Sequence, residues 1–229
     1  MVFENFKDLA HIAETELFTA LVGDILDKMG YYHQFLPQEL KPLREDMVIF
    51  GKAMPVVEAD FFDEHMLKSH NPLINKPFGI MFEALDSLQE DEVYICTGSS
   101  FRYALWGGLM STRAIKLKAA GAIVNGYSRD TNEILRLNFP VFSRGSYAQD
   151  QGPRGKVVDY RIPIEIGGVR INPGDIVYGD RDGIVIVPEP IMEQVFLKAI
   201  EKARGEQSVK KALEAGMSTV EAFDKFGIM

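Results

Sequence analysis

The stretch from residue 92 to residue 130 constrains the fold most, because it reads as a strand, a helix and a second strand. Residues 92–97 are apolar enough for a short buried strand, and the small residues of a turn follow them at 98–100. Residues 104–120 are helical by composition, and residues 121–126 form an apolar run that ends at a glycine. Two strands joined by a helix over this length are expected to be parallel neighbours in one sheet. The sequence therefore predicts an α/β fold.

Apolar spacing on both sides of this unit predicts further helices and short strands. Apolar residues recur at helical spacing in residues 15–30, and residues 80–88 favour a short helix. Residues 47–57 read as a long strand or a strand pair, with a bulge expected at Gly51. Glycine and proline turns then separate short strands, as in an antiparallel or barrel-like layer, at 140–142, 157–158, 162–166, 169–171, 176–178 and 184–187.

The end of the chain reads as a helical tail on the same domain. Residues 190–216 form a long amphipathic helix or a helix pair, within a tail of about 190–229. No shift in composition marks a boundary anywhere along the sequence. We therefore expect a single α/β domain over residues 1–229.

The net charge of −8 and the single cysteine argue against several classes of protein. An acidic surface is repelled by phosphate backbones, so nucleic-acid binding through a basic face is not expected. No apolar stretch approaches the ~18–20 residues that a membrane-spanning helix needs, so no membrane association is expected. Cys96 cannot form an intrachain disulfide, and the first seven residues lack the features of a signal peptide. We therefore expect a cytoplasmic protein in which Cys96 is a small buried hydrophobe.

The candidate site lies in two short segments of the strand–helix–strand unit. Residues 105–110 contain paired glycines and open the predicted helix, where free N–H groups favour an anion. Residues 126–130 follow the second strand and end in Arg129 and Asp130. The carboxyl ends of parallel strands and the amino ends of the following helices share one edge of the sheet, where ligands bind. Arg129 could bind a carboxylate with two N–H groups, and Asp130 could hold a hard cation such as Mg²⁺.

Each of these features also has a simpler interpretation. Adjacent Arg and Asp residues most often form a solvated surface pair, and a Gly-Gly pair is most often a turn. The combination of both features after a strand is what favours a site. The residues alone do not decide between the two interpretations.

Segments along nearly the whole chain resemble the RraA-like family. The similar segments are residues 23–27, 103–110, 121–130, 154–159, 167–175 and 179–185. This family includes metal-dependent 4-hydroxy-4-methyl-2-oxoglutarate aldolases, and also non-catalytic members that bind and inhibit a ribonuclease. The resemblance implies a swivelling β/β/α fold, with a mixed sheet and flanking helices. It also implies a homo-oligomer, either a trimer or a hexamer made of two trimers.

The resemblance also implies roles for individual residues. The aldolases carry an acidic residue, twenty residues, then Arg-Asp, and a further acidic residue three positions after that Asp. Arg129, Asp130 and Glu133 match this pattern, whereas Gly108 stands at the first acidic position. The resemblance implies that Asp130 binds Mg²⁺ or Mn²⁺ and that Glu133 binds the same metal through a water molecule. Gly108 is a departure that removes one negative charge from the surroundings of the metal.

The activity implied by the resemblance is class II aldol cleavage of a 4-hydroxy-2-oxo dicarboxylic acid to pyruvate, with oxaloacetate decarboxylation as a further reaction. Arg129 would stabilise the bound oxo acid and the enolate that forms from it. The backbone N–H groups of Gly107, Gly108, Leu109 and Met110 would bind its carboxylate. Two alternatives stay open, a protein-binding regulator of a ribonuclease and a metal-dependent 2-oxo acid decarboxylase only. A docking protein has no need to keep an Arg-Asp pair.

Three residues outside these segments are further candidates. The family builds its site between subunits and takes an acidic residue from the C-terminal part of a neighbouring chain, and Glu206 is the candidate for that role. His65 and His70 lie in a polar loop, where they are either proton donors near the site or solvent-facing side chains.

Overall fold

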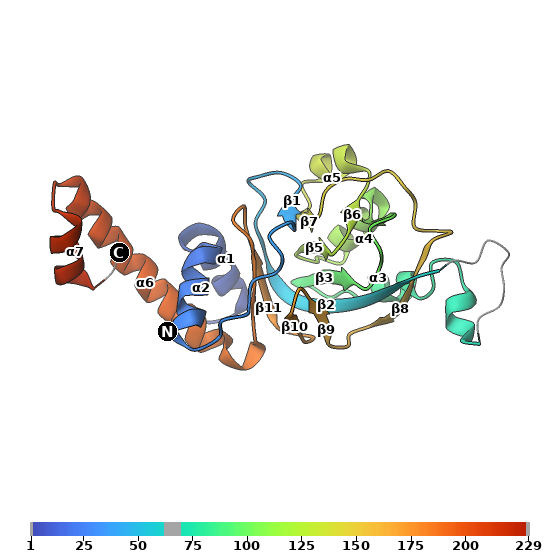
Figure 1. Ribbon diagram of the computed structural model, residues 1–229, viewed down its shortest axis with the longest axis horizontal. Coiled ribbons are helices and arrows are strands. Elements are labelled where there is room, and N and C mark those ends of the chain that lie inside the picture. Colours follow the sequence, from blue (N-terminus) through green and yellow to red (C-terminus); the bar gives the residue numbers. More distant parts are fainter. Residues whose placement is uncertain (1, 62–69, 228–229) are drawn as a thin grey trace.

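A curled mixed sheet forms the centre of the protein (Figure 1). The computed structural model describes residues 2–61 and 70–227. The strand order is β1-β7-β5-β3-β2-β11-β12, and β8 also pairs with β2. The strands are β1 (Lys41–Pro42), β2 (Ile49–Asp60), β3 (Glu92–Thr97), β5 (Gly121–Val124), β7 (Val141–Ser143), β8 (Gly155–Tyr160), β11 (Ile176–Gly179) and β12 (Ile184–Val187). The α/β class that the sequence predicts is therefore confirmed.

The half of the sheet that contains β2, β3, β5 and β7 is parallel. Ile95 of β3 lies opposite Ile123 of β5, so the two strands of the predicted strand–helix–strand unit are indeed parallel neighbours. All four residues of β5 are buried, as expected for a strand that is covered on both faces. The carboxyl ends of these strands define one edge of the sheet, and the candidate site is expected there.

The predicted helix over residues 104–120 is wrong at its start. Residues Ala104–Trp106 form a strand, β4, which pairs in parallel with β6 (Tyr127–Ser128). The helix α4 (Gly108–Lys116) begins only after Gly107, whose backbone is extended. Helical composition fails here because the strand is stabilised by pairing with a segment more than twenty residues later, which local propensity does not record.

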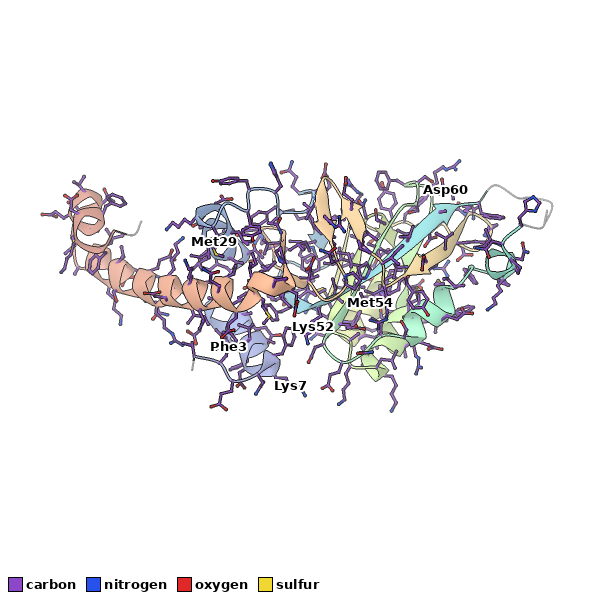
Figure 2. All side chains as sticks on the ribbon, turned by 90° about the horizontal axis from the view of Figure 1, so that it is seen from below. Phe3, Lys7, Met29, Lys52, Met54 and Asp60 are labelled. Carbon is purple, nitrogen blue, oxygen red and sulfur yellow. The ribbon has the colours of Figure 1, made fainter. Side chains whose placement is uncertain are left out.

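Antiparallel strands complete the other half of the sheet. β2 crosses the sheet part of the molecule, with Lys52 near its start and Asp60 at its end (Figure 2). It pairs with β11 near its start and with β8 near its end. The predicted bulge at Gly51 is wrong, because the register of β2 shifts instead between Val57 and Glu58. Gly51 has a different role. A Cβ there would lie 2.6 Å from the Asp91 carbonyl oxygen, so only glycine fits this close approach.

A separate hairpin covers the bottom of the curled sheet. It consists of β9 (Ile164–Ile166) and β10 (Val169–Ile171), which pair in antiparallel register. The two residues between them, Gly167 and Gly168, both have positive φ, as a tight two-residue turn requires. The predicted short strands after residue 140 are therefore confirmed, with β7 displaced by one residue.

The N-terminal residues form two helices where the sequence predicts one. The predicted helix over 15–30 is divided into α1 (Phe6–Glu16) and α2 (Thr19–Lys28), with extended backbone at Phe18. The carboxylate of Asp180 accepts hydrogen bonds from the Thr19 backbone N–H at 2.8 Å and from its hydroxyl at 2.7 Å. This distant carboxylate caps the start of α2, so the break depends on a tertiary contact.

The remaining helices are two short α-helices near α4, two 3₁₀ turns and the two C-terminal helices. The short helices α3 (Met81–Asp86) and α5 (Thr131–Leu137) lie with α4 on the same side of the sheet (Figure 1), and α3 confirms the short helix expected at 80–88. The turns η1 (Pro72–Asn75) and η2 (Glu189–Ile191) are 3₁₀ helices. The C-terminal α6 (Met192–Glu214) and α7 (Thr219–Phe226) form the predicted tail.

The C-terminal tail extends away from the sheet as an arm (Figures 1 and 2). The first half of α6 packs on α2 through Val195, Phe196, Ala199 and Ile200, which are all buried. α7 then turns back, and its first turn has a capping box between Ser218 and Glu221. In the described part of the chain, no helix combines the length and apolarity that a membrane crossing requires.

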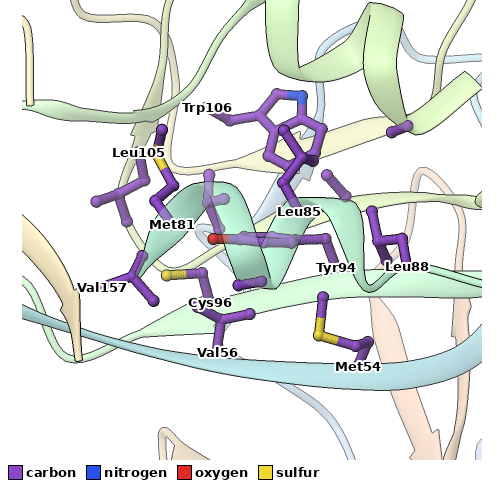
Figure 3. Packing of buried hydrophobic residues seen from close by; sticks show 14 of the residues in the cluster. Met54, Val56, Met81, Leu85, Leu88, Tyr94, Cys96, Leu105, Trp106 and Val157 are labelled. Atoms are coloured by element: carbon purple, nitrogen blue, oxygen red, sulfur yellow. The ribbon is translucent and has the colours of Figure 1, made fainter. Parts of the chain in front are cut away.

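The core is divided between the two faces of the sheet. Figure 3 shows the cluster under α3, in which Met81 and Leu85 pack near Trp106, Tyr94 and Cys96. Cys96 is completely buried and its thiol pKa is raised well above the usual range by burial, so it is the buried hydrophobe that the sequence predicts. A second cluster fills the space between the sheet and α1, α2 and α6 on the same face. A third cluster lies on the other face, where β9 and β10 pack against Ile95 and Ile123.

Candidate active site

The two segments that the sequence singles out meet at one edge of the sheet. β4 and β6 are paired, and the backbone N–H of Arg129 donates to the carbonyl of Trp106 at 2.9 Å. Gly107 and α4 follow the first strand, and Arg129 and Asp130 follow the second. The predicted convergence of a helix amino end with Arg129 and Asp130 is therefore present in the structure.

Asp130 is held at the start of α4 by its own backbone conformation. It lies in the left-handed region, with φ 57°, and immediately precedes α5. Its Oδ2 accepts a hydrogen bond from the Gly108 backbone N–H at 3.1 Å. A left-handed backbone is uncommon outside glycine and is best tolerated by Asp and Asn, so the chain keeps this conformation only where the surroundings require it. The carboxylate lies at the helix end that favours negative charge.

Two glycines make this approach of carboxylates to α4 possible. A Cβ at Gly107 would lie 2.8 Å from Oδ2 of Asp130, and a Cβ at Gly108 would lie 2.3 Å from Oε2 of Glu133. Asp130 and Glu133 therefore both reach the first turn of α4. The space that a side chain at position 108 would need is occupied by the carboxylate of Glu133, and restoring an acidic residue there requires Glu133 to move.

Arg129 is fixed between two carboxylates. Its NH1 lies 2.6 Å from Oδ1 of Asp150, and its Nε lies 3.8 Å from Oδ2 of Asp130. The other oxygen of Asp150 accepts from the Gly152 backbone N–H at 2.9 Å, so Asp150 is held by its own turn. About 39% of the Arg129 side chain stays exposed, which leaves part of the guanidinium free to meet a ligand.

Asp150 and Gln151 are site residues that the sequence does not reveal. Both line a cavity of about 350 Å³ together with Arg129 and Asp130. Their only signal in the sequence is a glycine-rich loop around them, because Asp150 follows Arg129 by more than twenty residues and matches no motif.

Gln151 is a buried residue of this cavity lining. The residue is 5% exposed, and its backbone carbonyl accepts from the N–H groups of Arg154 and Gly155 at 2.7 and 2.9 Å. Its Nε2 has no hydrogen-bond acceptor among the residues that the structure describes. A buried donor without an acceptor is costly, so this amide is well placed to donate to an oxygen of a ligand.

The other side of the cavity is apolar. Leu109 and Met110 contribute from α4, and the remaining apolar lining comes from β4 and from residues around α3. The lining residues of this kind are Phe78, Met81, Phe82, Leu85, Ala104, Leu105, Trp106, Leu109 and Met110. Trp106 is buried, stacks on Phe139 and donates its indole N–H to Ser111 at 2.8 Å, so it also packs the core beneath the cavity.

The oxygen groups of this cavity fit a hard divalent cation. Mg²⁺ in proteins typically uses one or two carboxylates and keeps several waters, and Mn²⁺ has similar preferences. Oδ1 of Asp130 has no donor among the described residues, so it is free to coordinate. No group of three or more His, Cys, Asp or Glu side chains suited to a metal occurs in residues 2–61 and 70–227. Asp130 would therefore be the direct ligand, with water and substrate oxygens completing the coordination.

The net negative charge of the cavity lining also favours binding of a divalent cation. Arg129 contributes one positive charge, whereas Asp130 and Asp150 contribute two negative charges. An anionic substrate would be repelled by this balance, and a bound divalent cation would reverse it.

Four of the residues predicted from the sequence do not line this cavity: Gly108, Glu133, Glu206 and His70. Glu206 lies on α6, 3.4 Å from Lys202, and lines a groove between α6 and the start of α2 instead. Its predicted role in a neighbouring subunit stays a prediction. His70 is exposed and is not part of the cavity lining, and His65 lies outside the described residues.

Outside the cavity, the carboxyl group of Glu58 lies on β2 and is buried in the core. Glu58 is 2% exposed, and burial raises its pKa to about 8, an effect that the Tyr103 hydroxyl partly offsets. Its Oε1 has no donor among the described residues. Tyr103 donates to Oδ1 of Asp60 at 3.0 Å. A Cβ at Gly155 would lie 2.5 Å from Oε1 of Glu58, so the carboxyl is tightly enclosed.

Comparison with known proteins connects the chain to one family. Residues 19–186 match the profile of the RraA-like family, described as Aldolase/RraA. A Halalkalibacterium halodurans protein with the provisional name 4-hydroxy-4-methyl-2-oxoglutarate aldolase is 29% identical over 205 residues, which cover 90% of this chain and 89% of that protein. Protein DlpA of Legionella pneumophila is 26% identical over 209 residues, covering 91% of this chain. The chain spans only about a third, 32%, of the length of DlpA.

Solved structures show the same fold. A structure described as one of novel cellulases from gut-associated microbes has a TM-score of 0.80 at 32% identity, and covers 90% of this chain and 88% of that one. Streptomyces coelicolor RraAS2, described as an unusual member of the RNase ES inhibitor RraA family, has a TM-score of 0.73 at 18% identity. That match covers 90% of this chain and 97% of RraAS2, and it shows the fold alone.

Proposed function

This chain belongs to the RraA-like family, and we propose that it is a divalent-metal-dependent lyase that cleaves a 4-hydroxy-2-oxo acid to pyruvate and a carbonyl compound. The observation that carries this proposal is the placement of Arg129 and Asp130 at the start of α4, inside a cavity. The names of relatives such as the Halalkalibacterium halodurans protein support the same type of reaction.

Each polar group of the cavity has a task in such a reaction. Asp130 would hold Mg²⁺ or Mn²⁺, and Glu133, which reaches the same turn of α4, would contribute through water. The bound cation supplies Lewis-acid stabilisation of the negative charge that develops on the 2-oxo group. Arg129 is held in place by Asp150, so its free N–H groups are oriented before the substrate arrives and can stabilise the same charge.

The first turn of α4 would bind the carboxylate of the substrate. The Gly108 N–H is already bound to Asp130, so Leu109 and Met110 provide the N–H groups that are left for this purpose. They belong to the first turn, where a helix offers no internal acceptor. The predicted cradle of residues 107–110 is thus shared between Asp130 and the substrate.

The test is an assay of pyruvate release from a panel of 4-hydroxy-2-oxo acids and oxaloacetate, with and without Mg²⁺ or Mn²⁺. We expect metal-dependent pyruvate release from at least one member of the panel. Release from oxaloacetate alone would identify a 2-oxo acid decarboxylase, since loss of CO₂ also leaves an enolate for Arg129 to stabilise. No release from any compound would contradict the proposal and favour the ribonuclease regulator, which needs no metal-binding cavity.

We also propose that the protein is a trimer or a dimer of trimers. The arm of α6 and α7 supports this, because Val220 and Phe223 on it are 69% and 56% exposed and offer an apolar stripe to a neighbour. Light scattering should give a mass of three or six times 25.7 kDa. A monomer at micromolar concentration would exclude a site shared between subunits, and with it the role of Glu206.

A further inference from the structure

The cavity has a polar end and an apolar end. A 4-hydroxy-2-oxo dicarboxylic acid, which the family resemblance implies as substrate, has no apolar group that would fill the apolar end. Arg129, Asp130, Asp150 and Gln151 form the polar end. Residues of α3 and its start, including Phe78, Met81 and Phe82, form the opposite wall with Leu105 of β4. Figure 3 shows that Met81 and Leu105 are continuous with the core, so this wall is the edge of a packed cluster.

The charge of the lining bears on the far end of the substrate. Arg129 is the one cationic side chain among the described residues that line the cavity, and Asp150 already binds its NH1 at 2.6 Å. One carboxylate, next to the 2-oxo group, can be bound by the polar end. A second carboxylate packed against Phe78 and Phe82 would lose part of its water without gaining a cation or a donor from the described residues that line the cavity, which is unfavourable.

The shape of the apolar end fits a ring or a branched chain. Phe78 and Phe82 meet edge to face, with centroids 5.6 Å apart, and Phe82 is 53% exposed. A large apolar side chain that is half exposed at a cavity mouth is covered when an apolar group of a ligand packs against it. The cavity volume of about 350 Å³ lies within the usual range for small-molecule sites.

We propose that the substrate is a monocarboxylic 4-hydroxy-2-oxo acid whose C4 substituent is an uncharged aryl or branched alkyl group. This inference rests on the proposed lyase function and names its substrate class. The bond between C3 and C4 breaks, and its electron pair passes to C3 and the 2-oxo group to give the enolate of pyruvate. The C4 hydroxyl loses its proton and becomes the carbonyl of an aryl or alkyl aldehyde, and C3 gains a proton. The reaction needs no oxidant or reductant.

The experiment compares substrates that differ only at C4. Pyruvate release is measured with Mn²⁺ for 4-hydroxy-2-oxo acids that carry phenyl, isopropyl, methyl or carboxylate at that carbon. We expect kcat/KM to be at least about 10-fold higher for phenyl or isopropyl than for carboxylate, since even one methylene in an apolar pocket is worth about 10-fold or more. A preference for the carboxylate compound would overturn the inference while leaving the lyase function in place.

A variant pair tests whether the α3 wall sets this preference. Phe82→Arg places a cation at the apolar end, and it should raise the relative rate of the carboxylate compound by about 10-fold or more. Ile115→Arg is the matched control, because Ile115 is 40% exposed on α4 and does not line the cavity. An equal preference in both variants and the wild-type protein would show that Phe82 does not face the substrate, which would also overturn the inference.

A binding measurement separates this inference from the reaction itself. Calorimetric titration with Mn²⁺ present compares 2-oxo-4-phenylbutanoate with 2-oxoglutarate, neither of which has a 4-hydroxyl to cleave. Tighter binding of the phenyl compound supports the apolar end even if every pyruvate assay fails. Tighter binding of 2-oxoglutarate, or no binding of either compound, contradicts it.

Discussion

Asp130 and Glu58 are carboxyl groups in two regions of the molecule, and their surroundings differ in opposite ways. The side chain of Asp130 is 43% exposed, accepts the Gly108 N–H and lies 3.8 Å from the guanidinium of Arg129. Glu58 is 2% exposed on β2, no described residue places a cation beside it, and burial raises its pKa to about 8. Donors and a cation favour a carboxylate, whereas burial without them favours a neutral acid.

This difference separates a binding group from a structural one. Burial raises the pKa of Glu58 to about 8 and so favours its neutral form, which offers little attraction to a metal ion. Asp130 faces a cavity and keeps one oxygen without a protein donor among the described residues. The number of carboxylates near a site therefore says less about metal binding than the donors that surround each one.

The largest expected effect comes from removing the charge of Asp130. Asp130→Asn keeps the shape of the side chain but should abolish Mn²⁺ binding, and kcat/KM for pyruvate release should fall by about 1,000-fold or more. Calorimetric titration with Mn²⁺ measures the first effect. Glu58→Gln is the control, for which we expect wild-type Mn²⁺ affinity. Unchanged affinity in Asp130→Asn would mean that the comparison assigns the metal to the wrong carboxylate.

The second prediction is a change in the free energy of unfolding with pH, caused by Glu58. Its folded-state pKa is raised to about 8 from 4.5, so the folded protein holds this proton more tightly than the unfolded chain. The stabilising effect is complete below pH 4.5 and is lost as the pH rises through 8. The free energy of unfolding should therefore fall by on the order of 3 kcal/mol between about pH 5 and 8.

The measurement is urea unfolding of the wild-type protein and Glu58→Gln across this pH range. The variant carries no titrating group at position 58, so its curve should be flatter. If the two pH profiles are parallel, Glu58 is ionised in the folded protein and the contrast with Asp130 disappears.

The third prediction concerns Arg129, which lies beside Asp130 in the cavity and is proposed to stabilise the substrate oxygens. Arg129→Lys keeps the charge but cannot contact Asp150 and a substrate oxygen at the same time with a planar group. The loss of one charged hydrogen bond is worth about 1.5–3 kcal/mol, which lowers kcat/KM by about 10- to 150-fold. Steady-state kinetics give this value, and Arg181→Lys, at a surface ion pair with Glu45, should keep wild-type activity. An Arg129→Lys rate within twofold of wild type would identify Arg129 as a surface ion-pair partner.

The smallest effect compares two buried polar atoms without protein partners. Gln151 is a residue of the cavity lining, whereas Glu58 is not. Gln151→Leu removes a donor that the substrate should use, so KM should rise by about 5- to 10-fold, in line with one neutral hydrogen bond. Thermal unfolding should be unaffected or slightly improved, because no protein acceptor is lost. A lower melting temperature with an unchanged KM would show that the amide serves the fold and not a ligand.

Local sequence determined much of the architecture. Residues 92–97 and 121–126 are short apolar runs on either side of a helical segment, and their parallel pairing follows from the length of the connection. The same reasoning brought Arg129 and Asp130 to the amino end of α4, because both segments lie within one strand–helix–strand unit. These features depend on residues close together in the chain, so periodicity and turn residues are enough to predict them.

Only the tertiary structure decided the features that depend on distant partners. Ala104–Trp106 has helical composition but pairs with β6, and α2 begins at Thr19 because Asp180 caps it. Asp150 holds Arg129, and the wall from α3 gives the cavity its apolar end. The burial that raises the pKa of Glu58 comes from neighbours on other elements. Burial and long-range pairing are properties of the packed chain, and no local pattern of residues records them.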